Sequence, residues 1–526
     1  MPTFFLDGEP VEFEPGQDIL TAALKVDQFI PHYCYHPAMS RVATCRMCMV
    51  EVEDDGRGRK MPKLQTSCST QAMENMKVVT KNDRVKRARE SVMEFLLINH
   101  PLDCPICDQA GECSLQDYSF NFGTGKSIVS HEKRIYGLRD IGSFLQLERN
   151  RCIHCTRCVR FTQEITGTHE MGVYGRTHQL TVDTFVDYPL SDQFQGNLAD
   201  ICPVGAITMK DFRFKKRVWH LKKAASICTG CSTGCNVWLH HHDGQIHRVT
   251  PRENQQLNKW WMCDFGRISF HEYMKKENRV LNPLISGEKS NWKKALDSFD
   301  HAFNQSDSSA DQVVVLASSS STCEELFALK RVVSNISNNV KLLFTSQPKD
   351  DAEFDQTFKT FISKDKKPNQ NGVRKLGFQE IGKEPSGIEW SNVKLLMVLG
   401  EEHDKWFELQ TAIQKAEMSV FISCLKSKYT NEFNLVLPTL SPLEKEGFYI
   451  NRTGVLQKLR VSIAKPFSAK SELLILEDLE KATKLSQSAY PSTTEIRKEM
   501  AQSDVFYAPM TVSSEALVPK IPSQCY

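Results

Sequence analysis

The placement of cysteine constrains this chain more than any other feature of its sequence. Fifteen of the 18 cysteines lie before residue 264, and the other three are Cys323, Cys424 and Cys525. The first eight residues have no basic segment and no long apolar run, so we expect neither a signal peptide nor a transit peptide. Without an export signal, metal ligation explains so many thiols better than disulfide bonds do. We therefore expect metal centres in the first half of the chain.

Composition and charge exclude some classes of function. Of the 526 residues, 40% are apolar and 25% charged, as in ordinary globular proteins. A chain of this length is expected to form roughly three to five domains. A formal net charge of +2 provides no basic field, so we expect no nucleic-acid partner. The sequence contains no run of about 18 apolar residues, so we expect no membrane span. We expect the chain to reach a membrane only through protein partners.

The first group of cysteines follows a predicted β-hairpin and helix. Thr3–Leu6 and Val11–Phe13 are the predicted strands, and the helix runs from about residue 18 to 26. Gaps of ten, two and nineteen residues then separate four candidate ligands: Cys34, Cys45, Cys48 and Cys68. Plant-type 2Fe–2S ferredoxins use a similar close pair with two flanking ligands. Spacing alone leaves a structural zinc site open.

The second group follows a predicted helix over residues 83 to about 99, capped by Asn82 or Asp83. We expect one face of this helix to carry Val85, Ala88, Val92, Phe95 and Asn99. The helix should end at His100-Pro101, because the residue before proline avoids helical geometry. The candidate ligands are His100, Cys104, Cys107 and Cys113. A set of three cysteines and one histidine also suits zinc, so the metal remains open on spacing.

The third and fourth groups have the spacing of 4Fe–4S sites. The third is Cys152, Cys155 and Cys158, with a distant Cys202 followed by proline, as in bacterial ferredoxins. The fourth is Cys228, Cys231, Cys235 and Cys263. Zinc sites prefer two pairs of ligands, whereas these ligands group as three plus one. Both groups therefore favour a 4Fe–4S cluster.

Basic residues lie among these ligands: Arg46, Arg151, Arg157 and Arg160. Some of them are expected to be ordinary surface charge. A cation close to a cluster would favour its reduced state, because thiolate-ligated clusters become more negative on reduction. The arginines are therefore candidates for tuning cluster potentials.

The segment His100–Cys113 resembles the hallmark of the large iron–sulfur subunits in the peripheral arm of respiratory complex I, the bacterial type and its mitochondrial 75-kDa counterpart. All four ligand groups are similar to that family, in the same order, over residues 1 to about 285. The resemblance implies a 2Fe–2S cluster at the first group and 4Fe–4S clusters at the others, with His100 as a ligand. The fourth group resembles an extra cluster found in some bacterial members, which indicates a bacterial source.

After residue 267 the resemblance is to molybdopterin oxidoreductases, which have α/β domains. Alternating elements indicate a parallel sheet, with strands at 313–316, 394–399 and 420–423 and helices at 324–333 and 404–416. Residues 437–457 are similar to a loop that approaches the pterin in formate dehydrogenases. Only about 260 residues follow Cys263, too few for a complete pterin-binding body. We therefore expect no molybdenum cofactor.

The expected fold class is α+β followed by α/β. We expect a long surface loop over residues 346–390 and an extended tail over the last 30 residues. The expected domains are a ferredoxin-like 2Fe–2S domain (1–80), a His/Cys3-ligated 4Fe–4S module (81–140), a bacterial-ferredoxin-like 4Fe–4S module (141–222), an additional 4Fe–4S domain (223–285) and a shortened molybdopterin-oxidoreductase-like body with a tail (286–526).

The resemblance implies an electron-relay subunit of an NADH:quinone oxidoreductase that couples electron transfer to ion translocation. The implied partners are the flavin- and NADH-binding subunit and the iron–sulfur subunits on the quinone side. The implied location is peripheral, on the cytoplasmic face of the bacterial inner membrane. The chain has no strand–turn–helix G-x-G-x-x-G motif, so we expect NADH and flavin to bind elsewhere and no complete active site or catalytic residue here.

Two other functions remain possible on sequence. A related formate dehydrogenase or hydrogenase would share these clusters, but would need a molybdenum ligand after Cys263 or further clustered cysteines. Cys323 and Cys424 do not lie in a convincing ligand motif. A redox-inactive zinc scaffold is the third hypothesis, and a brown colour in the purified protein would exclude it.

We predict that the anaerobically purified protein holds one 2Fe–2S and three 4Fe–4S clusters, about 14 iron atoms per chain. The basis is sixteen candidate ligands in four groups. Metal analysis and visible absorption test this. A preparation that contains mainly zinc, or iron for two clusters only, would contradict it.

Overall fold

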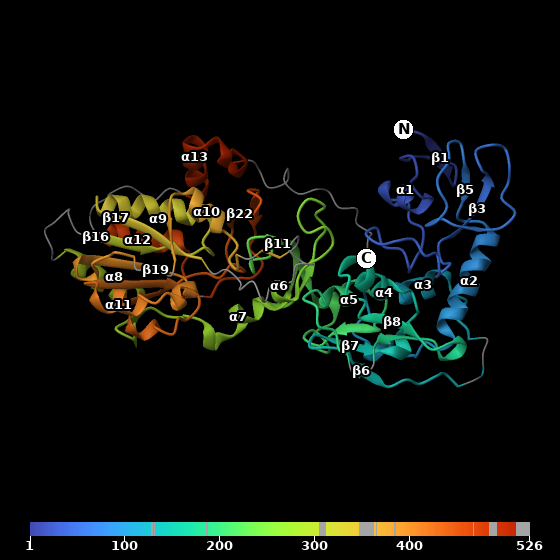
Figure 1. Cartoon of the computed structure of the whole chain (residues 1–526), viewed down its shortest axis with the longest axis horizontal. Coiled ribbons are helices and arrows are strands. Elements are labelled where there is room, and N and C mark those ends of the chain that lie inside the picture. The colour runs from blue at the N-terminus through green and yellow to red at the C-terminus, as the bar shows by residue number, and fades with distance from the viewer. Residues whose placement is uncertain are drawn as a thin grey trace. The chain divides into compact units, whose positions relative to one another are not determined.

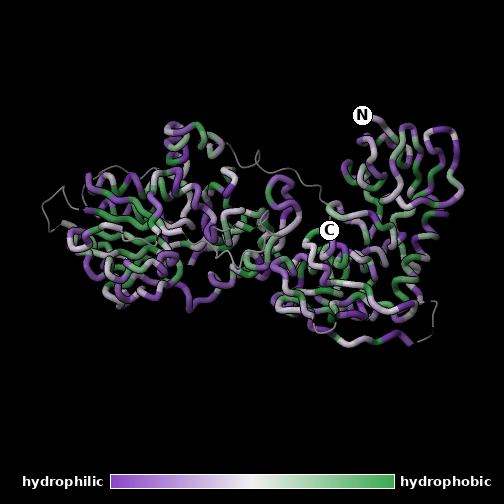
Figure 2. The backbone as a smooth tube through the Cα atoms, viewed as in Figure 1, coloured by the Kyte–Doolittle hydropathy of each residue, from purple (hydrophilic) through white to green (hydrophobic). Residues whose placement is uncertain are grey.

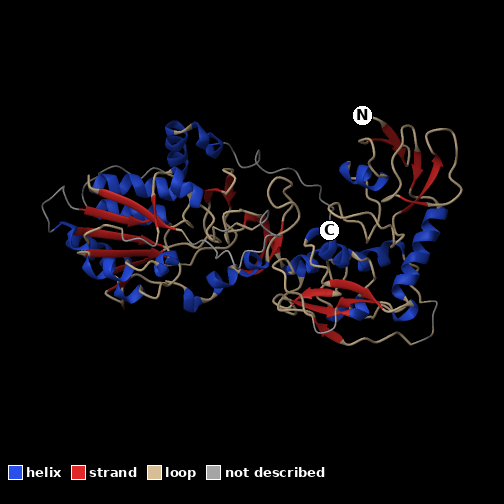
Figure 3. Ribbon diagram, viewed as in Figure 1, coloured by secondary structure: helices blue, strands red, loops and turns tan. Residues whose placement is uncertain are grey.

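The computed structural model describes the whole chain apart from residues 128–129, 131, 186–187, 305–311, 347–361, 364, 383–385, 467, 483–491 and 512–526. The chain forms two compact units, with a first unit of residues Met1–Leu221 and a second within Lys222–Val518. Figure 1 shows the course of the chain, and Figure 3 shows its helices and strands. Each unit is described on its own below.

The first unit begins with a ferredoxin-like sheet of order β2-β1-β5-β3-β4, in which β1 and β5 pair in parallel. Its elements are β1 (Thr3–Leu6), β2 (Glu9–Glu12), α1 (Ile19–Lys25), β3 (Met49–Asp54), β4 (Gln65–Thr66) and β5 (Lys77–Val79). Alternate strand residues such as Phe4 and Val50 are fully buried against Leu20 of α1. Asp18 caps α1 by accepting a hydrogen bond from the Thr21 amide at 2.7 Å. The predicted hairpin and helix are confirmed.

Helix α2 (Asp83–Leu97) is confirmed, but the face predicted from apolar spacing is only partly the buried one. The buried residues are Val85, Arg89 and Met93, while Phe95 is 75% exposed. Arg89 is buried because its guanidinium donates hydrogen bonds to the carbonyl oxygens of Thr80 and Met49. These partners lie outside the helix, so the spacing of apolar residues within the helix could not indicate that Arg89 is buried.

The rest of the first unit consists of short elements joined by long loops. They are η1 (Cys104–Ile106), α3 (Ser114–Phe122), β6 (Leu138–Asp140), β7 (Leu145–Glu148), η2 (Arg149–Arg151), α4 (Arg157–Arg160), η3 (Phe161–Ile165), β8 (Met171–Tyr174), η4 (Thr177–Gln179), β9 (Thr181–Thr184), α5 (Gly196–Ile201), β10 (Ile207–Met209) and η5 (Val218–His220). Strands β10, β7 and β6 form one antiparallel sheet, and β8 and β9 form a hairpin. With so little regular structure, side-chain hydrogen bonds to the backbone must hold the loops.

The second unit begins with an antiparallel sheet of β11 (Lys222–Ile227), β12 (Asn236–His242) and β13 (Gln245–Pro251). Three short helices follow: α6 (Asp264–Ile268), α7 (Phe270–Met274) and η6 (Lys276–Asn278). The body is a sheet of order β15-β14-β21-β20-β19-β16-β17-β18. Neighbouring strands from β16 to β21 pair in parallel, whereas β14 and β15 are antiparallel.

The elements of this body are β14 (Leu284–Ile285), β15 (Glu288–Lys289), α8 (Trp292–Asn304), β16 (Gln312–Leu316), α9 (Cys323–Ile336), β17 (Val340–Thr345), α10 (Gln370–Lys375), β18 (Gln379–Ile381), η9 (Trp390–Asn392), β19 (Val393–Leu399), η10 (Glu401–Lys405), α11 (Leu409–Lys415), β20 (Met418–Ser423), η11 (Thr430–Glu432), β21 (Leu435–Pro438), β22 (Gly447–Ile450), β23 (Leu456–Leu459), α12 (Glu472–Ala482), α13 (Thr493–Ser503) and η12 (Val505–Thr511).

Both faces of this sheet are buried, as expected for parallel strands covered by helices. Val313 and Val315 of β16 pack with helices α8, α9, α12 and α13, whereas Val314 and Leu316 pack with α11. The sheet strands are accordingly hydrophobic in Figure 2. The predicted α/β body with a parallel sheet is confirmed.

Three sequence predictions in this body were wrong. Residues 365–381 of the predicted surface loop include α10 and the sheet strand β18. The predicted helix over residues 404–416 begins only at Leu409, because the Asp404 carboxylate instead accepts hydrogen bonds from Ser427 and the Lys428 amide. The predicted tail contains η12 and the end of α13, up to residue 511. Pro519, Pro522 and Cys525 lie outside the described residues.

A buried ion pair joins the start of this body to its later strands. Arg279 donates two hydrogen bonds of 2.9 Å to the carboxylate of Glu444, and both side chains are at most 5% exposed. Replacing Arg279 alone leaves a buried carboxylate without its cation. We therefore expect Arg279→Met to lower the free energy of unfolding of the second unit by about 3–5 kcal/mol.

Urea unfolding tests this expectation. Arg374 is a matched control, because it pairs with Glu380 at 2.9 Å while both side chains are 39% exposed. We expect Arg374→Met to cost no more than about 1 kcal/mol. Equal losses for the two variants would show that burial of the Arg279 pair has no special energetic weight.

Candidate metal centres

The first cysteine group converges in the loops beside the ferredoxin-like sheet. Cys34, Cys48 and Cys68 are each 1% exposed. Cys48 directly precedes β3, and its carbonyl oxygen accepts hydrogen bonds from the amide and the hydroxyl of Ser67. The neighbouring thiols of Cys45 and Cys68 hold the pKa of Cys34 well below its usual range. All four predicted ligands of this group therefore lie together.

The second group is brought together in part. Cys104 begins η1, Cys107 ends it and Cys113 precedes α3. Burial raises the pKa of Cys113 to about 12, and the nearby thiols of Cys107 and Cys104 act in the same direction. Cys104 is exposed, whereas the other two cysteines are buried.

His100 meets the chemical requirement for a ligand, although no hydrogen bond joins its ring to these thiols among the described residues. Burial lowers the pKa of His100 to about 4, and the cations Lys133 and Arg151 add to the effect. The imidazole is therefore neutral at pH 7, which is the ligating form. Its Nδ1 atom is buried without a hydrogen-bond partner. The assignment of His100 as a ligand stays a prediction.

The third group surrounds the start of α4 and the end of α5. Cys152 follows η2, Cys158 lies within α4, and Cys202 follows α5. Burial raises the pKa of Cys152 to about 12, and the thiols of Cys155 and Cys202 add to this. Burial likewise raises the pKa of Cys202 to about 11, opposed by backbone amides that donate to its sulfur. The four predicted ligands therefore lie within electrostatic reach of one another.

The fourth group lies between β11, β12 and α6 of the second unit. The backbone closes the first loop, because the Cys228 amide donates to the Cys235 carbonyl at 2.7 Å. Backbone amides of Gly230 and Gly266 donate to the sulfurs of Cys228 and Cys263 at 3.4 Å. Burial raises the pKa of Cys263 to about 12, and the Cys231 thiol adds to this.

Two glycines allow the backbone to approach cysteine sulfurs closely. A methyl group built at Gly205 would lie 2.2 Å from the Cys107 sulfur, and one at Gly266 would lie 2.7 Å from the Cys228 sulfur. Backbone amides aimed at sulfur are the interactions that stabilise thiolate-ligated clusters. Over the described ranges, no group of three or more His, Cys, Asp or Glu side chains is placed to hold a metal ion. The chemistry of the donor set, sulfurs that accept backbone hydrogen bonds, fits thiolate-ligated iron–sulfur clusters.

Three of the groups are joined by direct contacts within the first unit. Arg157 donates to the Tyr35 carbonyl at 2.6 Å, which links the third group to the loop of Cys34. The Ser114 amide donates to the Pro203 carbonyl at 3.1 Å, which links the second group to the loop of Cys202. The rings of Tyr33 and Tyr118 lie 5.0 Å apart, between the loop of the first group and α3.

The arginines predicted near the ligands differ in burial, which the sequence did not indicate. Arg151 and Arg160 are 5% and 4% exposed, whereas Arg46 is exposed surface charge. Arg151 pairs with Asp103 at 2.9 Å. The sequence also did not predict the close approach of Gly205 to Cys107, and only the glycine in Cys202-Pro203-Val204-Gly205 could have pointed to it.

We predict that Gly205→Ala removes the second cluster without removing a ligand. Gly205 does not have a positive φ, so the new methyl group acts by crowding, mainly of the Cys107 sulfur at 2.2 Å and to a smaller extent of the Gln109 Cβ at 3.1 Å. Iron content should fall by about four atoms per chain, the complement of one 4Fe–4S cluster. Gly137→Ala is the control, because a methyl group there meets no atom within 4 Å. Full iron content in both variants would contradict the prediction.

Five family models match the chain. They are a 2Fe–2S iron–sulfur cluster binding domain (residues 1–83), the NADH-ubiquinone oxidoreductase-G iron–sulfur binding region (89–127), the ferredoxin-like domain of NADH-quinone oxidoreductase subunit 3 (142–208), the molybdopterin oxidoreductase Fe4S4 domain (221–274) and molybdopterin oxidoreductase (357–482). The order of these models supports the fold class: a ferredoxin-like domain, 4Fe–4S modules and a molybdopterin-oxidoreductase-like body.

Curated relatives include the mitochondrial NADH dehydrogenase [ubiquinone] iron–sulfur protein 1 of Solanum tuberosum, 38% identical over 64% of this chain and 45% of the relative. The NADH-ubiquinone oxidoreductase 75 kDa subunit of Reclinomonas americana is 36% identical over 68% of this chain and 51% of the relative. The NADH-quinone oxidoreductase G subunit of Rickettsia conorii is 36% identical over 64% of this chain and 49% of the relative.

Among solved structures, a chain of an NAD+-reducing [NiFe]-hydrogenase in the H2-reduced state is 32% identical. The match covers 41% of this chain and 91% of that one, with a TM-score of 0.37. The chain spans about half the length of the curated relatives it matches. Over about two thirds of its length, it is a relative of the G subunit of NADH-quinone oxidoreductase and of the 75-kDa subunit of the mitochondrial enzyme.

Proposed function

We propose that the chain is an electron-relay subunit of an NADH-quinone oxidoreductase, respiratory complex I, which passes electrons from NADH through flavin and iron–sulfur clusters towards quinone, coupled to ion translocation. The observation that carries the proposal is the set of direct contacts that joins three ligand groups in one unit. The contacts connect the Cys34 group to the Cys152 group and the Cys152 group to the His100 group, and the Tyr33 and Tyr118 rings also join the first group to the second. The family resemblance implies that electrons pass through the Cys34, Cys152 and His100 clusters in that order.

The proposed ligands hold one 2Fe–2S cluster at the first group and 4Fe–4S clusters at the other three, and bound clusters supply one-electron transfer. The protein's own part is to bury the thiols, donate backbone hydrogen bonds to sulfur and place cations nearby. For example, the amide of His154 donates to the Cys152 sulfur at 3.4 Å. No residue of this chain is proposed to be catalytic.

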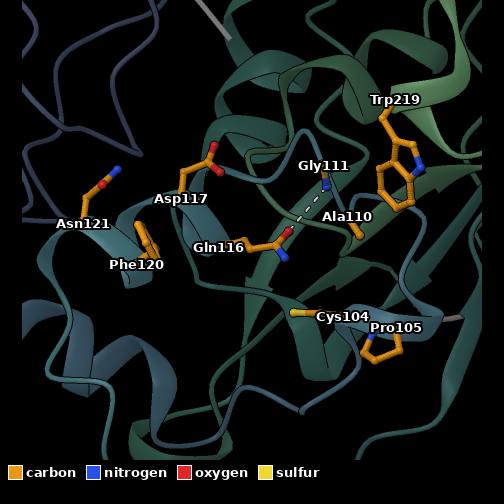
Figure 4. Close-up of a pocket in the computed structure, with 9 residues that line it drawn as sticks. All are labelled: Cys104, Pro105, Ala110, Gly111, Gln116, Asp117, Phe120, Asn121 and Trp219. Atoms are coloured by element: carbon orange, nitrogen blue, oxygen red, sulfur yellow. Dashed lines mark hydrogen bonds between the residues drawn. The ribbon is translucent and has the colours of Figure 1, made fainter.

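The exposed side of the second ligand group supports the proposal that electrons leave the chain at this group for a protein partner. Cys104 lines a groove of about 650 Å³ together with Phe120 and Trp219, which are 91% and 61% exposed. Figure 4 labels these residues on the wall of the groove. Exposed aromatic rings beside a redox site are typical of surfaces that a protein partner covers. We propose an iron–sulfur subunit on the quinone side as that partner, and the flavin- and NADH-binding subunit as the donor.

Membrane association is proposed to depend on these partners. Among the described residues, no helix has the length and apolar character needed to cross a bilayer. We propose a peripheral position on the cytoplasmic face of a bacterial inner membrane, as part of the assembled complex.

Buried charges in the second unit support the absence of a molybdenum cofactor. Lys445 pairs with Glu325 at 2.8 Å and with Glu472 at 3.2 Å. Lys367 pairs with Glu401 at 2.8 Å, beside the end of β19. Each cation is thus paired with a protein carboxylate rather than available to a pterin phosphate. Stoichiometric molybdenum in the purified protein would instead favour a formate dehydrogenase function.

Two cysteine substitutions test the proposed path in the assembled complex. We expect Cys155→Ala to abolish most NADH-to-quinone electron transfer, because it removes a ligand from the group that contacts both others. We expect Cys228→Ala to lose one cluster yet keep much of the activity, since the family resemblance places the fourth cluster off the main path.

The control is Cys424→Ala, which removes a buried cysteine outside the four groups. Complex assembly and NADH oxidation with an artificial acceptor are measured in parallel. A fully assembled Cys228→Ala complex without turnover, or a Cys155→Ala complex with normal turnover, would refute the proposed path.

A further inference from the structure

Two guanidinium groups lie between the first and third ligand groups and hold both loops. Arg157 donates to the carbonyl oxygens of Tyr35 at 2.6 Å and Ile201 at 3.1 Å. Arg160 donates to the carbonyl oxygens of Ser40 at 2.7 Å and of Cys34. Cys34 is itself a proposed ligand, Tyr35 follows it, and Ile201 precedes the proposed ligand Cys202. Each arginine therefore contacts the backbone around the proposed ligands.

Neutral carbonyl oxygens, rather than carboxylates, accept the hydrogen bonds of these two cations. All of their hydrogen bonds go to backbone carbonyls, and neither forms an ion pair within the ranges that the structure describes. Arg160 is 4% exposed, and the Nε atoms of both arginines are buried without a hydrogen-bond partner. Burying a cation without a negative partner is costly. A negative group at the adjacent ligand sites would remove that cost.

The position of Arg160 brings its charge close to both groups. It lies in α4 two residues after the proposed ligand Cys158, and its guanidinium donates to the carbonyl oxygen of the proposed ligand Cys34. The carboxylate of Glu164 accepts hydrogen bonds from the amide and hydroxyl of Ser40, so it also lies at the first loop. One guanidinium is therefore within electrostatic reach of both ligand groups.

We propose that Arg157 and Arg160 are positioning residues that act as a shared counter-charge for the first and third clusters and hold their loops in a fixed relation. The inference rests on the proposed cluster ligands. Reduction adds one electron to a cluster without breaking a bond, so a nearby buried cation favours the reduced state. Because the same cation faces both groups, its removal should affect both potentials in the same direction.

Redox titration followed by EPR, with the full-length protein purified anaerobically, tests the inference. We expect Arg160→Gln to shift the midpoint potentials of both the 2Fe–2S cluster and the third-group cluster to more negative values, with iron content unchanged. Arg160→Lys keeps the charge but loses the planar fork of donors, so we expect its midpoint potentials to lie closer to those of the wild type than the potentials of Arg160→Gln do. The control is Arg87→Gln on the exposed side of α2, where solvent screens the lost charge.

The outcomes separate this inference from the proposed function. A wild-type protein without the first or third cluster signal would refute the proposed ligands. Intact signals at unchanged midpoints in Arg160→Gln, or a shift in one cluster only, would overturn the shared counter-charge alone. If Arg160→Gln fails to assemble its clusters, Arg157→Gln is titrated in the same way. A negative shift of both midpoints supports the inference, and no shift overturns it.

Discussion

Burial of thiol groups is the constraint on which the rest of this structure depends. Most of the fifteen cysteines before residue 264 lie in loops at the ends of short strands and helices, and all except Cys104 are buried or half-buried. A buried thiolate needs a positive partner or hydrogen bonds, and the chain supplies both at its ligand loops. Amides of His154, Gly230 and Gly266 donate to sulfur, and Arg157 and Arg160 place charge between two groups. Near the proposed ligands, much of the backbone therefore forms hydrogen bonds with sulfur or with arginine side chains rather than within helices or sheets.

The local part of this arrangement could be predicted from sequence, because short cysteine spacings reflect local chain geometry. The hairpin, helix α1 and the alternation of strands and helices in the second unit could also be predicted, because they depend on turn residues and apolar patterns that are local in the sequence. The buried face of α2 could not, because Arg89 is held by carbonyl oxygens of Thr80 and Met49 rather than by neighbours on its helix. Strand β18 was also missed, since three residues between polar segments carry no periodic signal and gain their place by pairing with β17.

Contacts between the ligand groups could not be predicted from the sequence. Arg160 and Cys34 are 126 positions apart, and Gly205 and Cys107 belong to different predicted modules. No spacing rule relates such residues, because their meeting depends on how separate loops pack. The same packing makes the third group the common neighbour of the other two in its unit. His100 is a different case, because the sequence indicated it as a ligand but the structure does not test that assignment. Its burial and its Nδ1 atom without a hydrogen-bond partner suit a ligand, while its bond to a cluster stays a prediction.

The exposure of Cys104 has a consequence for the life of the free chain. An accessible cysteine at a redox centre is open to attack by oxygen and peroxide, which convert thiolates to sulfenic and then irreversible sulfinic acids. Cys104 is the exposed cysteine of the four proposed ligand groups, and it lines the groove beside Trp219. We therefore expect aerobic damage to begin there, and a protein that covered the groove would slow that damage.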